Sequence, residues 1–316
     1  MNCLCCGKPL RTDDASGWHT SCIKRFFGTA KLPQIEIDDR TLENLAAQTI
    51  HRGYTVPGVQ KKLSLHLSQE QTPRLTIVNY PTGYILKPQV AEYTALPEAE
   101  QLVMSMADAA GIATVPHALI REREAYAYIT KRIDRAFAKN SPVKMLAMED
   151  FCQLDLRLTQ DKYRGSYERC AKIIERYSVR KGLDLSELFS RLVFSYIVGN
   201  SDMHLKNFSL IETAEGTGEY VLSPAYDLLP VNVIMPEDRE QFALAMNGKK
   251  MNLGRKDFLL FAEECGMQRN AAEKMIHALV AMLPTFQAMC EKALLPDVMR
   301  NGLAELVKHR CEKLEQ

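Results

Sequence analysis

The stretch that decides the fold is Val198-Gly199-Asn200-Ser201-Asp202-Met203-His204-Leu205-Lys206-Asn207-Phe208. It follows an apolar segment with helical periodicity, and it brings an acid, a histidine, a lysine and an amide together within a few positions. A second stretch, Ser223-Pro224-Ala225-Tyr226-Asp227-Leu228, follows and adds another carboxylate. This concentration of polar side chains directly after an apolar helix indicates a functional loop.

The side chains of these two stretches suit phosphoryl transfer. That reaction needs a base for the attacking hydroxyl and oxygen ligands that hold Mg²⁺ against the phosphates. Asp202 is the candidate base, and Asn207 stands at the offset of the D-x-x-x-x-N loop of protein kinases. Asp227 offers a second carboxylate for Mg²⁺, and Lys206 can neutralise charge on the moving phosphoryl group. The alternative interpretation is an ordinary polar turn between a helix and a strand.

Two features earlier in the chain add to the first interpretation. Lys87 ends an apolar strand, and Glu100 on the following helix is its candidate partner. A glycine turn near Gly58 precedes Lys61 and Lys62, so backbone N–H groups and positive charge can approach an anion there. Taken alone, the turn is more often a plain strand entry and the lysine a solvated one. The glycine turn, Lys87, Glu100, the Asp202 loop and Asp227 follow one another in this order, and together they favour phosphotransfer.

Hydrophobic periodicity divides the chain into a β-rich part and a helical part. Leucines alternate with polar residues over 63–67, which predicts a half-buried strand. We also expect strands at 74–80, 84–88, 114–120 and 125–131, a hairpin turn at 81–83, and helices at 41–50 and 98–110. From residue 136 onward we expect a helix through Leu188 and Tyr196 with Asp184 as N-cap, and helices 256–267, 270–283 and 297–314. The predicted domains are an N-terminal segment 1–33, a β-rich lobe 34–135 and a helical lobe 136–316.

The N-terminal segment carries a candidate zinc site. Cys3 and Cys6 form C-x-x-C, and His19 and Cys22 form H-x-x-C, which gives two chelating pairs for a closed tetrahedral Zn²⁺. Cys5 is a spare thiol. The alternative is a set of reduced residues without a metal. Because a closed site has no open position, its expected role is structural.

Composition excludes several classes of protein. The chain has 316 residues with a formal net charge of +1, so it lacks the bulk charge of a nucleic-acid or membrane binder. No apolar run reaches the roughly 18 residues of a membrane helix, and no signal peptide is recognisable. The nine cysteines are odd in number and unevenly spaced, which indicates reduced thiols. We therefore expect a cytoplasmic protein.

The motifs in this order resemble the HipA family of serine/threonine kinase toxins over roughly residues 53–316. The resemblance rests on Thr55-Val56-Pro57-Gly58-Val59-Gln60-Lys61-Lys62, Ile85-Leu86-Lys87, Glu149-Asp150-Phe151-Cys152-Gln153, Ser201 to Ser209, and Ser223 to Asp227. It implies a bilobed, protein-kinase-like α+β fold with a β-rich N-lobe, a helical C-lobe, and ATP with Mg²⁺ in the cleft.

The resemblance also assigns roles to residues. Asp202 is the catalytic aspartate, and Asn207 and Asp227 bind Mg²⁺. Residues 131–133 form the hinge that meets the adenine. The implied nucleotide-binding residues are Thr55, Pro57, Gly58, Val59, Gln60, Lys61, Lys62, Lys87, Glu100, Lys131, Arg132, Ile133, His204, Leu205, Lys206, Asn207, Tyr226 and Asp227. Lys131 replaces a carboxylate typical of the family hinge.

The implied partners are proteins. Family members phosphorylate aminoacyl-tRNA synthetases and are held by a DNA-binding antitoxin of the HipB type. Thr55 stands where relatives carry an autophosphorylated hydroxyl, usually serine. The chain lacks the extra N-terminal subdomain of full-length members, as do shorter relatives of the HipT type, in which a separate small protein replaces it. We therefore expect an antitoxin, a small subdomain-like partner and a protein substrate, with no direct contact to nucleic acid or membrane.

Two other functions stay open on the sequence alone. The chain could be a catalytically silent kinase-fold protein that binds a partner in a toxin–antitoxin complex. It could also be a small-molecule kinase with a similar cleft. The joint presence of Lys87, Asp202, Asn207 and Asp227 favours an active protein kinase.

Overall fold

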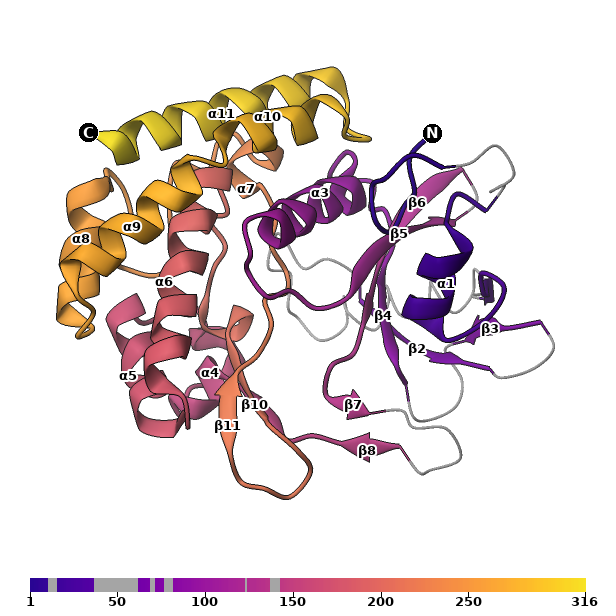
Figure 1. Ribbon diagram of the computed structural model, residues 1–316, viewed down its shortest axis with the longest axis horizontal. Coiled ribbons are helices and arrows are strands. Elements are labelled where there is room, and N and C mark those ends of the chain that lie inside the picture. The colour runs from indigo at the N-terminus through magenta and orange to yellow at the C-terminus, as the bar shows by residue number, and fades with distance from the viewer. Residues whose placement is uncertain (11–15, 37–61, 69–71, 77–81, 123, 137–142) are drawn as a thin grey trace. The chain divides into compact units, whose positions relative to one another are not determined.

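The computed structural model describes residues 1–10, 16–36, 62–68, 72–76, 82–122, 124–136 and 143–316. The chain forms two compact units, which are described separately (Figure 1). The first unit comprises 1–101 and 115–133, and the second comprises 102–114 and 134–316. Residues 1–33 belong to the first unit together with the β-rich part. The three domain limits expected from the sequence stay a prediction.

The first unit is built on one six-stranded sheet. Its strands are β1 (Gln34–Glu36), β2 (Leu63–Leu67), β3 (Arg74–Thr76), β4 (Tyr84–Lys87), β5 (His117–Glu122) and β6 (Ala125–Lys131). Their order across the sheet is β1-β3-β2-β4-β6-β5. All neighbouring strands are antiparallel except β1 and β3, which are parallel.

Strand β2 confirms the predicted alternation but corrects the predicted hairpin. Leu63 and Leu65 are buried while Ser64 between them is exposed. The expected hairpin at 81–83 between β3 and β4 is wrong, because β2 lies between these strands. The first half of β2 pairs with β4 and its last two residues pair with β3. The two leucines therefore lie in the half of β2 that pairs with β4.

The N-terminal segment contains a helix that sequence periodicity did not predict. Helix α1 (Thr20–Phe27) buries Phe26 and Phe27. These rings contact Trp18, with centroids 5.5 Å away, and Tyr84 of β4. An isolated helix of eight residues is marginal in water, so burial of its aromatic side chains against the sheet stabilises α1.

Helix α3 (Leu96–Ala109) was expected at 98–110 and is present with almost the same limits. Its residues 96–101 belong to the first unit and 102–109 to the second. The helix ends at Ala109, and Gly111 in the turn that follows adopts φ of +79°. Since only glycine takes this conformation easily, the predicted stop signal is confirmed.

The second unit combines helices with two small sheets. Its helices are α4 (Phe151–Leu154), α5 (Tyr167–Tyr177), α6 (Lys181–Val198), α7 (Val231–Ile234), α8 (Arg255–Glu264), α9 (Arg269–Val280), α10 (Leu283–Glu291) and α11 (Asp297–Glu315), with 3₁₀ turns η1 (Thr159–Asp161) and η2 (Leu205–Asn207). One sheet has the order β11-β10-β9, from Tyr220–Leu222, Ser209–Glu212 and Met148–Asp150, and the other pairs β7 (Arg135–Ala136) with β8 (Lys144–Met145). Helix α11 packs along α10 and against α6 (Figure 1).

Helix α6 forms the core of this unit. Leu188 and Tyr196 are fully buried, as the periodicity predicted. The expected N-cap at Asp184 is wrong, because α6 begins at Lys181 with Arg180 as its cap residue. Asp184 instead lies inside the helix, and its buried carboxylate accepts hydrogen bonds from the Ser178 hydroxyl and the Leu222 amide. Helices 256–267, 270–283 and 297–314 are confirmed as α8, α9 and α11, whereas α10 was not expected.

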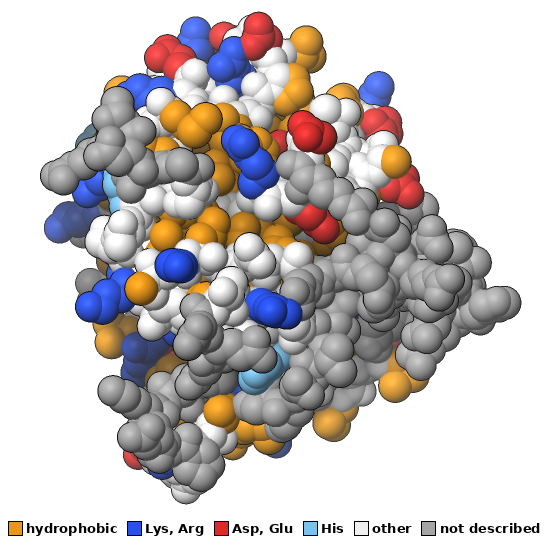
Figure 2. All heavy atoms as spheres, turned by 90° about the vertical axis from the view of Figure 1, so that its right-hand side faces the viewer, with side chains coloured by type: hydrophobic (Ala, Val, Ile, Leu, Met, Phe, Trp, Pro, Cys, Tyr) orange, Lys and Arg blue, Asp and Glu red, His pale blue; other side chains and the backbone are white. Residues whose placement is uncertain are grey.

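The surface carries charges of both signs. On the face shown in Figure 2, hydrophobic side chains lie among Lys and Arg side chains, and most of the visible Asp and Glu side chains lie in the upper part of the view. Among the described helices, none combines the length and the apolar character that crossing a bilayer requires.

Candidate active site

The loop that carries the candidate catalytic residues begins where α6 ends. Gly199 adopts φ of +71° and closes the helix with bonds from its N–H to the carbonyls of Ser195 and Tyr196. A Cβ at this position would lie 2.4 Å from Leu306 Cδ2. Glycine is therefore required both for the backbone conformation and for the close approach of α11.

Three contacts fix the backbone of the loop. The hydroxyl of Tyr167 in α5 donates to the carbonyl of Met203 at 2.9 Å. The Leu205 amide donates to the Lys162 carbonyl at 3.2 Å. The Ser201 hydroxyl donates to Asp238 at 2.6 Å. The loop is thus attached at its start, middle and end to segments distant in sequence.

Asp202 presents a partly exposed carboxylate in this fixed loop. Its side chain is 45% exposed. One oxygen, Oδ1, accepts a hydrogen bond of 2.8 Å from the hydroxyl of Tyr163. The other, Oδ2, lies 3.9 Å from His204 Nε2. A partly exposed carboxylate that is held in place by a hydrogen bond can accept a proton from an approaching hydroxyl.

Asn207 is oriented by the same loop. Its side chain is buried, and its Nδ2 donates to the backbone carbonyl of Asp202 at 3.0 Å. Because the amide nitrogen is used in this way, the amide oxygen is directed away from that carbonyl and can act as a ligand. The structure therefore places Asp202, His204 and Asn207 in one fixed loop, and their roles stay a prediction.

The segment that contains Asp227 is tied to this loop through its neighbour. The hydroxyl of Tyr226 lies 2.5 Å from Ser209 Oγ and donates to the carbonyl of Lys206 at 3.1 Å. Burial raises the pKa of Tyr226, so its hydroxyl keeps its proton and stays a donor. Asp227 has φ of +61°, a left-handed conformation that is unfavourable for a residue with a side chain and is often found at functional sites.

Lys206 has a partner that the sequence analysis did not anticipate. Its Nζ lies 2.6 Å from Asp150 Oδ2, and both side chains are mostly buried. Asp150 in turn caps α4, where it accepts from the Gln153 amide at 2.9 Å. If Lys206 contacts a phosphate as predicted, its ammonium group interacts with both that phosphate and Asp150.

In the first unit, Lys87 and Glu100 form the predicted pair. Lys87 Nζ lies 2.5 Å from Glu100 Oε1, and the side chains are 4% and 0% exposed. The ammonium group also lies 5.2 Å from the centre of the Tyr128 ring on the neighbouring strand. A buried charge pair of this kind is costly to desolvate and is a weak contributor to stability, so it is better explained by a functional role.

The predicted hinge residues lie at the end of β6. The Lys131 amide donates to the Pro116 carbonyl, and the Arg132 amide donates to the Gly83 carbonyl. Burial lowers the pKa of Lys131. Lys131, Arg132 and Ile133 are all partly exposed. Their contact with adenine stays a prediction.

Part of the predicted nucleotide site falls outside the described residues. This part comprises Thr55, Pro57, Gly58, Val59, Gln60 and Lys61, and the expected helix 41–50 lies outside them as well. Lys62 is described, and it is exposed directly before β2.

The N-terminal cysteines and histidine gather at one point. Cys3, Cys6, His19 and Cys22 offer ligand atoms that all lie within 4.8 Å of one another. This is the one group of three or more possible metal ligands found among the described residues. The four residues predicted from their spacing are therefore brought together.

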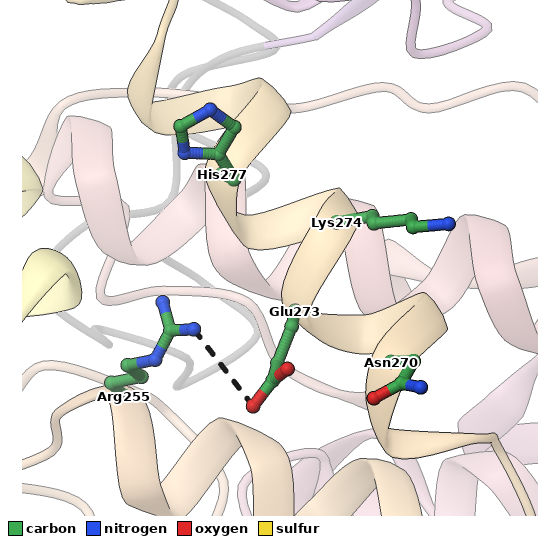
Figure 3. Close-up of a pocket in the computed structure, with 5 residues that line it drawn as sticks. All are labelled: Arg255, Asn270, Glu273, Lys274 and His277. Atoms are coloured by element: carbon green, nitrogen blue, oxygen red, sulfur yellow. Dashed lines mark ion pairs between the residues drawn. The ribbon is translucent and has the colours of Figure 1, made fainter.

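A hollow of about 530 Å³ lies elsewhere in the second unit, between α8 and α9 (Figure 3). Arg255 reaches across it toward Glu273 at 3.9 Å, and Asn270, Lys274 and His277 complete its wall. None of the candidate catalytic residues lines it. Its open, charged surface is not the site that the motifs predict.

Two residues of the site were missed by sequence reasoning. Tyr163 bonds to Asp202 across 39 positions of sequence, and no local pattern connects the two. Asp150 was part of a quoted motif, but its pairing with Lys206 was not foreseen. Tyr163 lies in a turn and Asp150 at the end of β9, and both contacts join residues far apart in sequence, so periodicity gave no signal for them.

The comparisons with known proteins agree with these observations. A family model described as the HipA-like C-terminal domain matches residues 54–286. The chain belongs to the HipA-like family. The matched range contains four of the candidate site residues, Lys87, Asp202, Asn207 and Asp227.

Two curated relatives of the HipA-like chain carry kinase names. The protein named "Putative kinase" from Haemophilus influenzae is 26% identical, over 92% of this chain and 90% of that protein. "Putative kinase Y4mE" from Sinorhizobium fredii is 29% identical over 72% of this chain. The match spans about half of that relative, 54% of its length.

Two solved structures share the fold of the HipA-like chain. HipA from Shewanella oneidensis, in a complex with HipB and operator DNA, matches with a TM-score of 0.71 and 18% identity, over 83% of this chain and 65% of that chain. The proinflammatory kinase CtkA from Helicobacter pylori matches with a TM-score of 0.55 and 14% identity, over 75% of this chain and 86% of that chain. These similarities establish a kinase-like α+β fold, as the sequence predicted.

Proposed function

We propose that this HipA-like chain is a kinase that uses ATP and Mg²⁺ to phosphorylate a serine or threonine hydroxyl of a protein. The observation that supports this most is the loop geometry around Asp202. Its carboxylate is partly exposed and hydrogen-bonded on one side, and Asn207 is held beside it in the same loop. A proton acceptor and an oriented amide at this offset are the parts that kinase chemistry requires.

Each residue has a distinct part in this proposal. Asp202 orients the acceptor hydroxyl and accepts its proton. The ammonium group of Lys87, held by Glu100, binds phosphate oxygens of the nucleotide. His204 and Tyr163 keep the Asp202 carboxylate in one orientation.

The donor set suits Mg²⁺. Asn207 keeps an amide oxygen available because its nitrogen is bonded to the Asp202 carbonyl, and Asp227 supplies a carboxylate. Oxygen ligands of this type are what Mg²⁺ prefers, together with phosphate oxygens and water. The bound ion would neutralise charge on the phosphates, and Tyr226, bonded to Lys206 and Ser209, supports the segment that carries Asp227.

We also propose a biological setting for the enzyme. The Shewanella relative is part of a toxin–antitoxin system and was solved with HipB and operator DNA. By analogy, this chain arrests growth by phosphorylating a protein, with an aminoacyl-tRNA synthetase as the first candidate, and is restrained by a HipB-like antitoxin. A separate small protein related to the N-terminal subdomain of HipA is a further proposed partner.

The test is phosphotransfer with and without Asp202. Purified protein is incubated with [γ-³²P]ATP, Mg²⁺ and bacterial lysate, and label transfer to protein is measured. We expect Asp202→Asn to reduce the initial rate by at least about 100-fold, because a positioned base contributes on the order of 10²–10⁴. Asp297→Asn is the matched control, since Asp297 is an exposed acid in the first turn of α11 and should leave the rate unchanged.

The same variant separates the two leading functions. If Asp202→Asn abolishes both label transfer and growth arrest on expression, the kinase proposal stands. If growth arrest persists at the wild-type level while no label is transferred by either protein, the chain acts as a catalytically silent binding protein. Unchanged label transfer by Asp202→Asn would contradict the proposed role of the loop.

A further inference from the structure

We propose that Cys3, Cys6, His19 and Cys22 bind one structural Zn²⁺ ion, and that this ion holds the N-terminal segment on strand β5. This inference does not depend on the proposed kinase activity. It rests on the positions of four ligand atoms, on the hydrogen bonds of His19, and on the contacts that the segment makes with the sheet.

The ligand atoms are spaced as a tetrahedral zinc site requires. His19 Nδ1 lies 3.3 Å from Cys6 Sγ and 3.9 Å from Cys22 Sγ. Around a tetrahedral Zn²⁺ with ordinary bond lengths, sulfur and nitrogen ligands lie about 3.6 Å apart and two sulfurs about 3.8 Å apart. All four ligand atoms lie within 4.8 Å of one another, so small side-chain rotations are sufficient to close the site.

The backbone around Cys3 and Cys6 forms a turn that points both thiols to one side. The Gly7 amide donates to the Cys3 carbonyl at 2.9 Å, and the Cys3 amide donates to the Lys8 carbonyl at 2.8 Å. Gly7 adopts φ of +67°, which permits this tight turn. The His19 amide is directed at Cys3 Sγ at 3.4 Å, a contact that stabilises a thiolate.

The hydrogen bonds of His19 leave the correct nitrogen for a metal. Its Nε2 lies 3.0 Å from the carbonyl oxygen of Pro9. Because a carbonyl can only accept, Nε2 carries the proton, and in the neutral ring Nδ1 then has the lone pair. Nδ1 is the atom that faces the cysteines. Metal-bound histidines in proteins are oriented in this way by a partner on the second nitrogen.

The neighbours of the four ligands connect the site to the sheet. Trp18 precedes His19, is completely buried, and donates from Nε1 to the Leu119 carbonyl at 3.1 Å. Leu4 follows Cys3, and its carbonyl accepts from the Leu119 amide at 2.9 Å. Both halves of the segment therefore meet β5 at one residue. A metal ion that joins Cys3 and Cys6 to His19 and Cys22 would hold both contacts with Leu119 in place at the same time.

The site has four protein ligands and no open position, which assigns it a structural rather than a catalytic role. Such a segment has little core of its own, since loops make up most of the described part of residues 1–19. Binding of the ion would supply the ordering that the short segment cannot obtain from burial alone.

The experiment uses the full chain and two readouts. Protein purified without chelator is analysed for metal, and Trp18, the single tryptophan of the sequence, reports on the contact with Leu119 through its fluorescence. We expect about one zinc per chain in the wild type. Removal by a strong chelator should shift the Trp18 emission to longer wavelength, and added Zn²⁺ should reverse the shift.

A matched pair of variants tests which thiols are ligands. Cys6→Ser removes a ligand and should lower the zinc content well below one per chain, whereas Cys5→Ser, its neighbour outside the four-residue set, should retain it. If Cys6→Ser does not fold, Co²⁺ substitution in the wild type gives the same information, because tetrahedral thiolate ligation produces intense visible and near-ultraviolet absorption.

Three results would overturn the proposal. A wild-type zinc content near zero after growth with added zinc, together with no tetrahedral Co²⁺ spectrum, would exclude the site. Equal zinc loss in Cys5→Ser and Cys6→Ser would exclude the assigned ligand set. Trp18 emission that does not change when bound zinc is removed would show that the ion does not hold the segment on β5.

Discussion

At the scale of single residues, the environment of Asp202 explains how its carboxylate is held for proton transfer. Tyr163 donates to Oδ1 at 2.8 Å, Oδ2 lies 3.9 Å from His204 Nε2, and the side chain as a whole is 45% exposed. Burial raises the pKa of Tyr163, and the negative charge of Asp202 raises it further. The phenol therefore keeps its proton around neutral pH and acts as a constant donor to the carboxylate.

We expect Tyr163→Phe to lower kcat by about 10-fold or less, since one hydrogen bond to a charged group contributes on the order of 1.5 kcal/mol. KM for ATP should stay unchanged because the nucleotide does not contact this phenol in the proposal. Loss of the donor destabilises the charged carboxylate, so the acid limb of the pH–rate profile should move to higher pH.

The measurement is the pH dependence of kcat for the wild type and Tyr163→Phe. Tyr177→Phe is the matched control, because Tyr177 is a partly exposed tyrosine at the end of α5 that contacts Arg176. A purely structural role for Tyr163 would lower the folding temperature without moving the acid limb. That result would contradict the assigned role.

At the scale of elements, the join between α6 and the catalytic loop depends on one glycine. Gly199 combines positive φ with a close approach of Leu306 from α11. Gly182 near the start of α6 has neither feature, since a Cβ at that position would meet no atom within 4 Å. Substitution by alanine is therefore expected to destabilise the protein at Gly199 but not at Gly182.

We expect Gly199→Ala to destabilise the protein by about 2–4 kcal/mol, from a left-handed conformation that costs roughly 1–2 kcal/mol and an overpacked contact of similar size. Gly182→Ala should be neutral or stabilising by up to about 1 kcal/mol. Thermal unfolding of both variants is the measurement. Equal folding temperatures for the two would contradict this account of the α6 terminus.

The elements also show which features the sequence could predict. Helices α6, α8, α9 and α11 were predicted because each repeats apolar residues over several turns. Helices α1 and α10 were not predicted; they have only eight and nine residues, which gives little more than two turns of periodic pattern. The β3–β4 hairpin was wrong because local turn signals do not reveal that a third strand lies between two strands.

At the scale of the whole molecule, the family and the fold class followed from short motifs in a fixed order. The Asp202 loop was predicted because its residues are contiguous in sequence. The Lys87–Glu100 pair was predicted because Glu100 lies on the helix that follows the strand of Lys87. The contacts of Tyr163 and Asp150 were not predicted, because they depend on how segments distant in sequence pack together. Tertiary packing, rather than local pattern, determines that part of the site.

The central proposal is that the side chains of Lys87, Asn207 and Asp227 each contribute to binding of MgATP. Removing Lys87 alone would leave Glu100 buried without its cation, which would destabilise the unit. The suitable variants are therefore Lys87→Met combined with Glu100→Gln, and Asp227→Asn. Lys144→Met, at an exposed lysine paired with Glu215, serves as the control.

The most direct measurement is the affinity for MgATP by titration calorimetry. We expect both variants to remain folded and to bind MgATP at least about tenfold more weakly than the wild type, a loss of about 1.4 kcal/mol, while Lys144→Met binds normally. Wild-type affinity in either folded variant would show that the substituted side chains do not bind MgATP, and would contradict the proposed active site.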